Sequence, residues 1–233
     1  GHEVIQLTPL EIDAALDRLD VLLLIQPNNP TGAIFTNEQL HGWHAQLAAR
    51  QGWLIIDEAF IEATTQASMV QADMPPGLIV LHSPGKFFGL AGARVGFVFA
   101  HDDLLLRIQN LLGPWNVSGP SRFVAQAALL DRDWQAATRA RLQQAGTRLA
   151  HMPLDAKLTP NGGCNLFQWV ITELAEAIHQ QLAQRGILTR LFTLPRSLRF
   201  GLPGSEAEWS RLQSALLEIS TLADSSPTRA EML

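Results

Sequence analysis

The fold is decided by residues 21–57, which read VLLLIQPNNPTGAIFTNEQLHGWHAQLAARQGWLIID. The apolar runs at 21–25 and 53–56 are short and are bounded by Pro, Asn, Gly or Asp, which is typical of buried strands. Between them, Thr36 begins a capping-box pattern, and apolar residues then recur on one helical face until Gly52, which we expect to stop the helix. A strand, a helix and a second strand in this order predict parallel pairing in an α/β fold.

The rest of the first half continues this alternation. Apolar runs at 78–81 and 95–99 predict two more strands. From about Asp102 to Ala150 the periodicity is helical, and its last stretch is long enough to form one extended helix. We therefore expect a first domain over residues 1–150, built on a mostly parallel sheet with flanking helices.

A second, smaller α+β domain is expected over residues 151–222, followed by a flexible tail at 223–233. Its predicted elements are strands at 166–171 and 197–200, and helices at 172–184 and from 205 onward. Gly186 is expected to stop the first of these helices, and a capping-box spacing at 205–208 opens the second.

Composition narrows the classes of function. The 233 residues are 47% hydrophobic and 17% charged, which is too apolar for a disordered chain, and no apolar run is long enough for a transmembrane helix. The lack of such a run argues against a membrane partner, and the formal charge of -5, without a basic block, argues against nucleic acid. A single cysteine, Cys164, argues against a disulfide and a cysteine-based zinc site, so no metal is expected and a cytoplasmic location fits best.

Polar clusters follow the predicted strands, at the carboxyl ends where open parallel sheets bind their ligands. The clusters are Pro27–Gly32, Asp57–Phe60, Ser83–Lys86 with Arg94 further on, and Leu198–Gly201 with Arg199. Taken singly, each has an ordinary structural explanation as a turn, a helix cap or a solvated side chain. Their order and spacing together are more specific than any one of them.

Three longer segments add detail to these clusters: SPGKFFGLAGARVGF at 83–97, GPWNVSGP at 113–120 and LRFGLPG at 198–204. From Leu22 to about Leu217, the whole set resembles the fold-type I enzymes that use pyridoxal 5'-phosphate, the class I and II aminotransferase superfamily. Within it, the three segments are similar to the threonine-phosphate decarboxylase branch of cobalamin biosynthesis, a close relative of histidinol-phosphate aminotransferase. The resemblance implies an α/β fold with a large domain that binds the cofactor and a small carboxyl-terminal domain.

The resemblance also implies which residues hold the cofactor. Lys86 matches the lysine that bonds to it, and Asp57 matches the carboxylate that keeps the pyridine nitrogen protonated, as an electron sink requires. Glu58 is then a structural neighbour. Asn29 matches the residue that hydrogen-bonds the ring hydroxyl. Phe60 stands where many aminotransferases have Tyr, so one hydrogen bond to that hydroxyl is lost.

The phosphate and the substrate have their own matching residues. Ser83 and Arg94 match ligands of the cofactor phosphate, whereas Gly85 stands where many relatives have Ser or Thr, which removes a phosphate contact. Arg199 matches the arginine that holds the substrate carboxylate through a bidentate pairing. Asn165 matches a position that often orients the substrate, although a polar residue at the start of a strand can equally serve as a turn residue.

Members of the superfamily carry a further segment before the position of Gly1. It supplies an amino-terminal arm, a loop whose amides cradle the phosphate and usually an aromatic side chain that stacks on the ring. By this resemblance the chain looks like a fragment, and we expect residues 1–233 alone to bind the cofactor weakly or not at all and to lack measurable activity. A homodimer is also implied.

Three functions remain open. The resemblance favours decarboxylation of L-threonine O-3-phosphate to (R)-1-amino-2-propanol O-2-phosphate. A transaminase of the histidinol-phosphate or aromatic amino-acid type would use the same residues and would depend on a 2-oxo-acid acceptor. A truncated, inactive chain that serves only in dimer formation is the third alternative.

Overall fold

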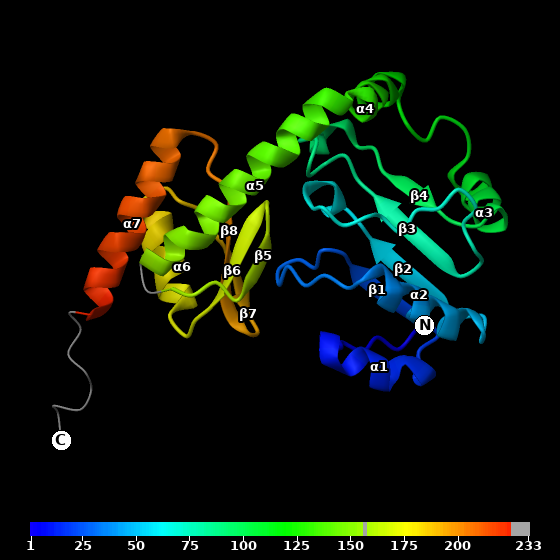
Figure 1. Ribbon diagram of the computed structural model, residues 1–233, viewed down its shortest axis with the longest axis horizontal. Coiled ribbons are helices and arrows are strands. Elements are labelled where there is room, and N and C mark those ends of the chain that lie inside the picture. The colour runs from blue at the N-terminus through cyan, green and yellow to red at the C-terminus, as the bar shows by residue number, and fades with distance from the viewer. Residues whose placement is uncertain (156–157, 225–233) are drawn as a thin grey trace. The chain divides into compact units, whose positions relative to one another are not determined.

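The computed structural model describes residues 1–155 and 158–224 (Figure 1). The chain divides into two compact units. The first consists of Gly1–Asn29 and Ala33–Ala136, and the second consists of Pro30–Gly32 and the chain from Ala137 onward. Among the described residues, no helix combines the length and the apolar character needed to cross a membrane.

The first unit is built on a four-stranded sheet in the order β1-β2-β3-β4. Its strands are β1 (Val21–Ile25), β2 (Trp53–Asp57), β3 (Leu78–His82) and β4 (Phe97–Phe99). The pairs β1/β2 and β2/β3 are parallel, which confirms the mostly parallel sheet expected from the sequence. The pair β3/β4 is antiparallel. Its connection holds only the short 3-10 helix η4 (Ala91–Ala93), and not the crossover α-helix that usually joins parallel neighbours.

Helix α2 (Asn37–Ala48) joins β1 to β2 and begins as the sequence predicts. The Gln39 N–H donates a hydrogen bond to the Thr36 hydroxyl (3.2 Å), and the Thr36 N–H donates to the Gln39 side chain (3.0 Å). The helix ends before Gly52, and the residue in the left-handed conformation is Gln51 (φ 59°). Gly52 is required by close packing instead, because a Cβ atom there would lie 2.8 Å from the Asp20 carbonyl oxygen.

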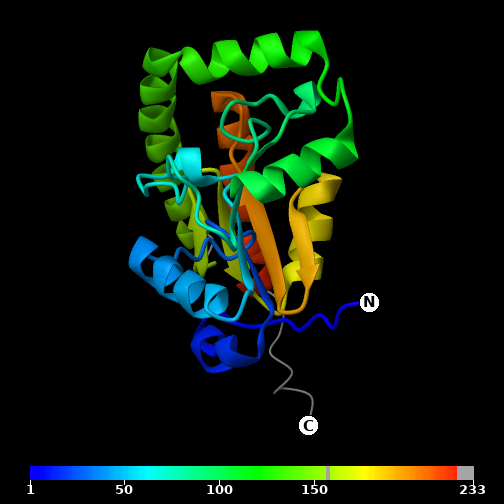
Figure 2. The ribbon, with the colours of Figure 1, turned by 90° about the vertical axis from the view of Figure 1, so that its right-hand side faces the viewer.

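The core of this unit lies between the sheet, α2 and two short helical turns, α1 (Ile12–Ala15) and η2 (Leu16–Arg18). The turn before them, η1 (Pro9–Glu11), has no buried residue. Figure 2 shows α2, in light blue, beside the strands. Strand β1 is buried on one face only, which differs from the fully buried strand expected. Leu22 and Leu24 face the core, whereas Leu23 is 62% exposed. Trp53 of β2, which pairs in register with Val21, is also 39% exposed, so it is this face of the sheet that is only partly covered.

The helical stretch expected from about Asp102 to Ala150 consists of three helices. They are α3 (Asp102–Leu112), α4 (Gly119–Leu130) and α5 (Arg132–Asp155). The segment between α3 and α4 interrupts the first two because Gly113 and Trp115 both adopt positive φ angles (69° and 62°). Helix α5, with 24 residues, is the extended helix predicted, and its residues belong to both units.

The second unit contains a four-stranded antiparallel sheet in the order β5-β6-β8-β7. Its strands are β5 (Gly162–Cys164), β6 (Phe167–Ile171), β7 (Arg190–Thr193) and β8 (Arg196–Gly201). Strands β6 and β8 confirm the two that were predicted. Strands β5 and β7 were not expected, because three or four residues are too few to show an alternating pattern.

Helices α6 (Ala175–Gln184) and α7 (Glu206–Asp224) pack with one face of this sheet in a second apolar core, to which Val170, Leu198 and Phe200 contribute. The predicted capping box is present: the Glu208 N–H donates to the Ser205 hydroxyl (3.3 Å), and the Ser205 N–H donates to the Glu208 carboxylate (3.0 Å). Within the expected tail, residues 225–233 lie outside the described residues.

Candidate active site

The first three polar clusters lie at one edge of the first sheet. In the parallel register, Ile25 is opposite Asp57, and Asp57 is opposite Leu81. The ladder continues past the strand ends, because the Gln26 N–H donates to the Asp57 carbonyl (2.8 Å) and the Glu58 N–H donates to the Leu81 carbonyl (2.8 Å). The loop after β1, the carboxylate of Asp57 and the loop after β3 therefore start from neighbouring points.

The loop that carries Asn29 is closed by a buried glutamine that the sequence analysis did not single out. Gln26 is 0% exposed, and its amide donates to the Phe35 carbonyl (2.7 Å) and accepts from the Phe35 N–H (3.0 Å). The Asn28 N–H also donates to the Ala33 carbonyl (2.8 Å). These bonds satisfy the buried amide and hold together the two ends of the loop that contains Asn29.

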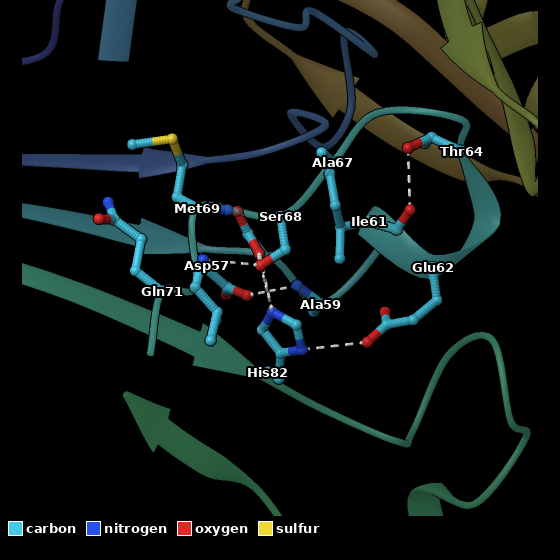
Figure 3. A network of polar contacts seen from close by, with 12 residues as sticks. Asp57, Ala59, Ile61, Glu62, Thr64, Ala67, Ser68, Met69, Gln71 and His82 are labelled. Atoms are coloured by element: carbon cyan, nitrogen blue, oxygen red, sulfur yellow. Dashed lines mark hydrogen bonds and ion pairs between the residues drawn. The ribbon is translucent and has the colours of Figure 1, made fainter. Parts of the chain in front are cut away.

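Asp57 and Phe60 lie where β2 leaves the sheet. The Asp57 side chain is half-buried, and its Oδ1 atom accepts a hydrogen bond from the Ala59 N–H (2.9 Å), which orients the carboxylate (Figure 3). Phe60 is buried, and the Lys86 Nζ atom lies 5.6 Å from the centroid of its ring. The amine and the segment that begins at Asp57 therefore meet in the first unit.

Lys86 is exposed, but the backbone beneath it is anchored. The next two residues, Phe87 and Phe88, are buried, and their ring centroids lie 5.6 and 5.9 Å from that of Trp134. The Leu90 N–H closes the loop by donating to the Pro84 carbonyl (3.0 Å). An exposed amine on an anchored backbone suits a residue that bonds to a ligand and then moves a proton.

Ser83 and Arg94 flank this loop. The Ser83 hydroxyl accepts a hydrogen bond from the Gly85 N–H (3.2 Å). Arg94 is exposed, adopts the left-handed conformation (φ 53°) and donates from Nη1 to the Ala91 carbonyl (3.2 Å). A left-handed residue other than glycine costs of order 1–3 kcal/mol, and such strain concentrates at functional sites. The conformation of Arg94 thus supports a role in binding.

A buried ionic cluster lies behind the edge that carries Asp57. Glu58 is 0% exposed, and its carboxylate contacts the His82 ring (2.7 Å) and accepts a hydrogen bond from the Met69 N–H (2.8 Å). Burial by itself lowers the pKa of His82, but hydrogen bonds to Glu58 and Glu62 outweigh it and raise the pKa to about 9. The sequence did not indicate the contact between His82 and Glu58, because the two residues are 24 positions apart.

Arg199 lies in the second unit, inside β8 rather than at the end of a parallel strand as expected. The difference arises because this sheet is antiparallel, so ligand-facing side chains stand on a face and not at strand ends. Arg199 is paired in register with Trp169 on β6 and with Arg190 on β7, so the three side chains share the face opposite the apolar core. Burial, and next the charge of Arg190, lower the pKa of the Arg199 guanidinium.

Arg190 is thus a candidate binding residue that the sequence analysis missed. The sequence shows only a second arginine nine positions before Arg199. This spacing does not reveal that the two residues are neighbours, because they are brought together by the pairing of β7 with β8. Two guanidinium groups on neighbouring strands repel each other, which favours an anion between them or on each of them.

Asn165 occupies the turn between β5 and β6 and is half-buried. Helix α5 passes close to it at Gly146, where a Cβ atom would lie 2.8 Å from the Asn165 Cα atom. A glycine inside a helix costs roughly 1 kcal/mol relative to alanine, so its presence here is explained by this close approach. The turn and the helix together therefore fix the backbone of Asn165.

The chain is similar to known proteins of one family. Residues 3–216 match the family model described as aminotransferase class I and II. Over 217 residues the chain is 50% identical to a threonine-phosphate decarboxylase of Pseudomonas aeruginosa, a match that covers 93% of this chain and 66% of that protein. It is 32% identical to histidinol-phosphate aminotransferase 2 of Burkholderia lata, covering 90% of this chain and 61% of that protein.

A solved structure shows the same fold. The histidinol-phosphate aminotransferase from Sinorhizobium meliloti in complex with pyridoxal-5'-phosphate has a TM-score of 0.78 and 25% sequence identity, over 90% of this chain and 60% of that one. The likeness confirms the expected α/β fold of the fold-type I enzymes. The chain spans 60 to 66% of the length of these three relatives.

Proposed function

The chain belongs to the aminotransferase class I and II family, and from this premise we propose that it is a pyridoxal 5'-phosphate-dependent decarboxylase of L-threonine O-3-phosphate. The product is (R)-1-amino-2-propanol O-2-phosphate, the linker that cobalamin biosynthesis needs. The observation that carries the choice of substrate is the pair Arg190 and Arg199 on one sheet face, because this substrate has two anionic groups. The likeness to a threonine-phosphate decarboxylase supports the same choice.

The cofactor fits the donor set at the edge of the first sheet. That set contains an amine on an anchored loop, an oriented and half-buried carboxylate, a hydroxyl and a guanidinium. We assign cofactor binding to Asn29, Asp57, Phe60, Ser83, Lys86 and Arg94, and substrate binding to Arg199, Asn165 and Arg190. The large domain at 1–150 and the small domain at 151–222 are part of the same proposal.

When bound, the cofactor supplies an electron sink for the electron pair that remains at the substrate α carbon after the carboxylate leaves. Asp57 supports this by holding a proton at the pyridine nitrogen, which a carboxylate oriented by the Ala59 N–H can do. Lys86 holds the cofactor before the substrate arrives and afterwards donates a proton to the α carbon. In the net reaction the α carbon loses carbon dioxide and gains that proton.

Two arginines divide the anionic groups of the substrate between them. Arg199 is half-buried and packs 5.2 Å from the Phe167 ring, so its guanidinium is the more restricted and suits the planar carboxylate. Arg190 is exposed and packs 5.8 Å from the Phe192 ring, which leaves room for a bulkier phosphate. A substrate with both groups also removes the repulsion between the two cations.

The role of Arg190 predicts a selective defect. We expect Arg190→Gln to raise KM for threonine phosphate by about tenfold to a hundredfold, with little change in kcat. The reason is that the variant loses a charge-assisted hydrogen bond to the substrate, which contributes binding free energy of this size. Steady-state kinetics measures both. Arg196→Gln is the matched control, because Arg196 lies on the same hairpin but pairs with Glu173 at the surface (3.0 Å). Equal effects of the two variants would assign the substrate phosphate to other groups.

The transaminase alternative is separated by its products. Incubation of holoenzyme, expressed at its natural length, with threonine phosphate should release one carbon dioxide for each amine phosphate formed. Formation of a 2-oxo acid that depends on an added amino acceptor would instead identify a transaminase. Histidinol phosphate, which has a phosphate but no carboxylate, serves as the competing substrate in the same assay.

We also propose that the protein acts as a homodimer in the cytoplasm. Large apolar side chains on and between α3 and α4 stand in solvent, with Leu111 at 88%, Trp115 at 94% and Phe123 at 73% exposure. Such a concentration of apolar surface is typical of a protein interface, and a second copy of the chain would cover it.

A further inference from the structure

The buried ionic cluster contains one cation between two carboxylates. His82, the last residue of β3, places its Nε2 atom 2.7 Å from the Glu58 carboxylate and its Nδ1 atom 3.1 Å from the Glu62 carboxylate. Figure 3 shows the His82 ring between Glu62 and Ser68, which come from the segment after β2. Phe99 of β4 packs edge-on against the ring, at 5.2 Å between centroids. In the part of the chain that the structure describes, the charged groups that contact His82 are Glu58 and Glu62.

This arrangement favours the doubly protonated ring. A neutral imidazole has one N–H donor, so one of its nitrogens would present a lone pair to a carboxylate oxygen. The imidazolium donates to both carboxylates at once. The pKa of His82 follows this geometry: burial lowers it, yet the bonds to Glu58 and Glu62 raise it from 6.5 to about 9.

Ser68, His82 and Glu62 also lie in the order of a serine, histidine and acid triad, but they are not one. The Ser68 hydroxyl is 3.2 Å from the His82 Nε2 atom, and it donates to the Glu58 carboxylate at 2.5 Å. Because Nε2 carries a proton that it donates to the same carboxylate, it cannot accept one from Ser68. The cluster therefore links charges and does not activate a nucleophile.

The cluster joins the two segments that carry the candidate cofactor residues. Glu58 directly follows Asp57, and His82 directly precedes Ser83 in the loop that leads to Lys86. The contact between the Glu58 and His82 side chains reinforces the backbone bond from the Glu58 N–H to the Leu81 carbonyl (2.8 Å). Any separation of Glu58 from His82 would separate the two strand ends as well.

We propose that His82 is a positioning residue, which as a cation holds Glu58 and Glu62 together and thereby fixes the spacing between Asp57 and the Ser83–Lys86 loop. The inference rests on the proposed function, because the spacing matters only if these residues bind one cofactor. Loss of the His82 proton in alkaline solution leaves the buried carboxylate of Glu58 and the partly buried carboxylate of Glu62 without their cation, loosens the strand ends and weakens retention of the cofactor.

The sign of the pH effect follows from the two pKa values. His82 titrates near 6.5 in the unfolded chain and near 9 in the folded one, so it binds protons more tightly when folded. The stability that it contributes is complete below pH 6.5 and is lost as the pH rises through about 9. The thermal stability of the apoprotein should therefore fall over this interval by an amount that depends on His82.

The experiment compares His82→Gln, His82→Arg and Glu62→Gln with His41→Gln, a control at an exposed position of α2. Thermal unfolding of the apoprotein and release of cofactor from the holoenzyme are measured against pH. We expect His82→Gln to release cofactor about tenfold faster at neutral pH and to lose the alkaline fall in Tm. The control should behave as the unaltered protein does.

The other two variants distinguish positioning from simple packing. Arg keeps a cation with several donors, so His82→Arg should retain cofactor in alkaline solution, where the unaltered protein releases it. Glu62→Gln removes one of the two carboxylates and should lower the pH of half-release by about one unit. Identical pH profiles for all four variants and the unaltered protein would overturn the proposal.

Failure of the proposed function would give a different result. If the protein, expressed at its natural length, binds no pyridoxal 5'-phosphate at any pH, the proposed function fails, while the Tm profiles of the apoprotein still report the charge of His82. If the cofactor is retained equally in His82→Gln and in the unaltered protein, the proposed function stands and the role of His82 is wrong.

Discussion

Borohydride reduction of the holoenzyme is expected to leave a pyridoxyl group on the peptide that contains Lys86, and Lys86→Ala is expected to lower turnover by roughly a thousandfold or more. The reason is that one amine serves twice, first to hold the cofactor and then to donate a proton to the α carbon. Peptide mapping by mass spectrometry locates the label, and a product assay measures the turnover.

The chain offers a matched control for this experiment. Lys157 is its only other lysine, and it lies outside the described residues. Lys157→Ala should keep both the label on Lys86 and the turnover of the unaltered protein. A pyridoxyl group on Lys157, or full turnover in Lys86→Ala, would show that the anchored loop after β3 does not hold the cofactor.

Asp57→Asn is expected to lower turnover by about a hundredfold to a thousandfold while leaving some cofactor bound. An amide cannot keep the pyridine nitrogen charged, so the electron sink is weakened in the transition state more than in the ground state. The local fold should persist, because the Oδ1 atom of asparagine can still accept the hydrogen bond from the Ala59 N–H. Absorbance of bound cofactor and initial rates measure the two effects.

The control for this variant is Asp73→Asn, the same chemical change at an exposed position in the loop before β3. It should leave both the rate and the bound cofactor unchanged. Near-normal turnover in Asp57→Asn would mean that another acid lies beneath the ring, and Glu58 would be the first residue to test. Loss of all cofactor would instead assign Asp57 a role in binding more than in rate.

Local patterns in the sequence predicted the longer helices and strands of both units, but not the short strands β5 and β7. The helices that begin after Thr36 and Ser205 start with hydrogen bonds between residues three positions apart. The strands at 21–25 and 53–57 are recognisable as local apolar runs, although they form by pairing with each other. A capping box spans four residues, and an apolar run is visible without knowledge of its partner. The sequence, together with its resemblance to a family, also indicated every residue of the first unit that we propose to bind the cofactor.

Only the tertiary structure decided which residues from different elements meet. The antiparallel return of β4, the pairing of β7 with β8 that places Arg190 beside Arg199, and the position of His82 between Glu58 and Glu62 all depend on register between distant segments. No local pattern encodes such contacts, because the free energy that selects them comes from the packing of whole elements against one another. The sequence therefore determined which groups are available for chemistry, and the fold determined the charges that surround them.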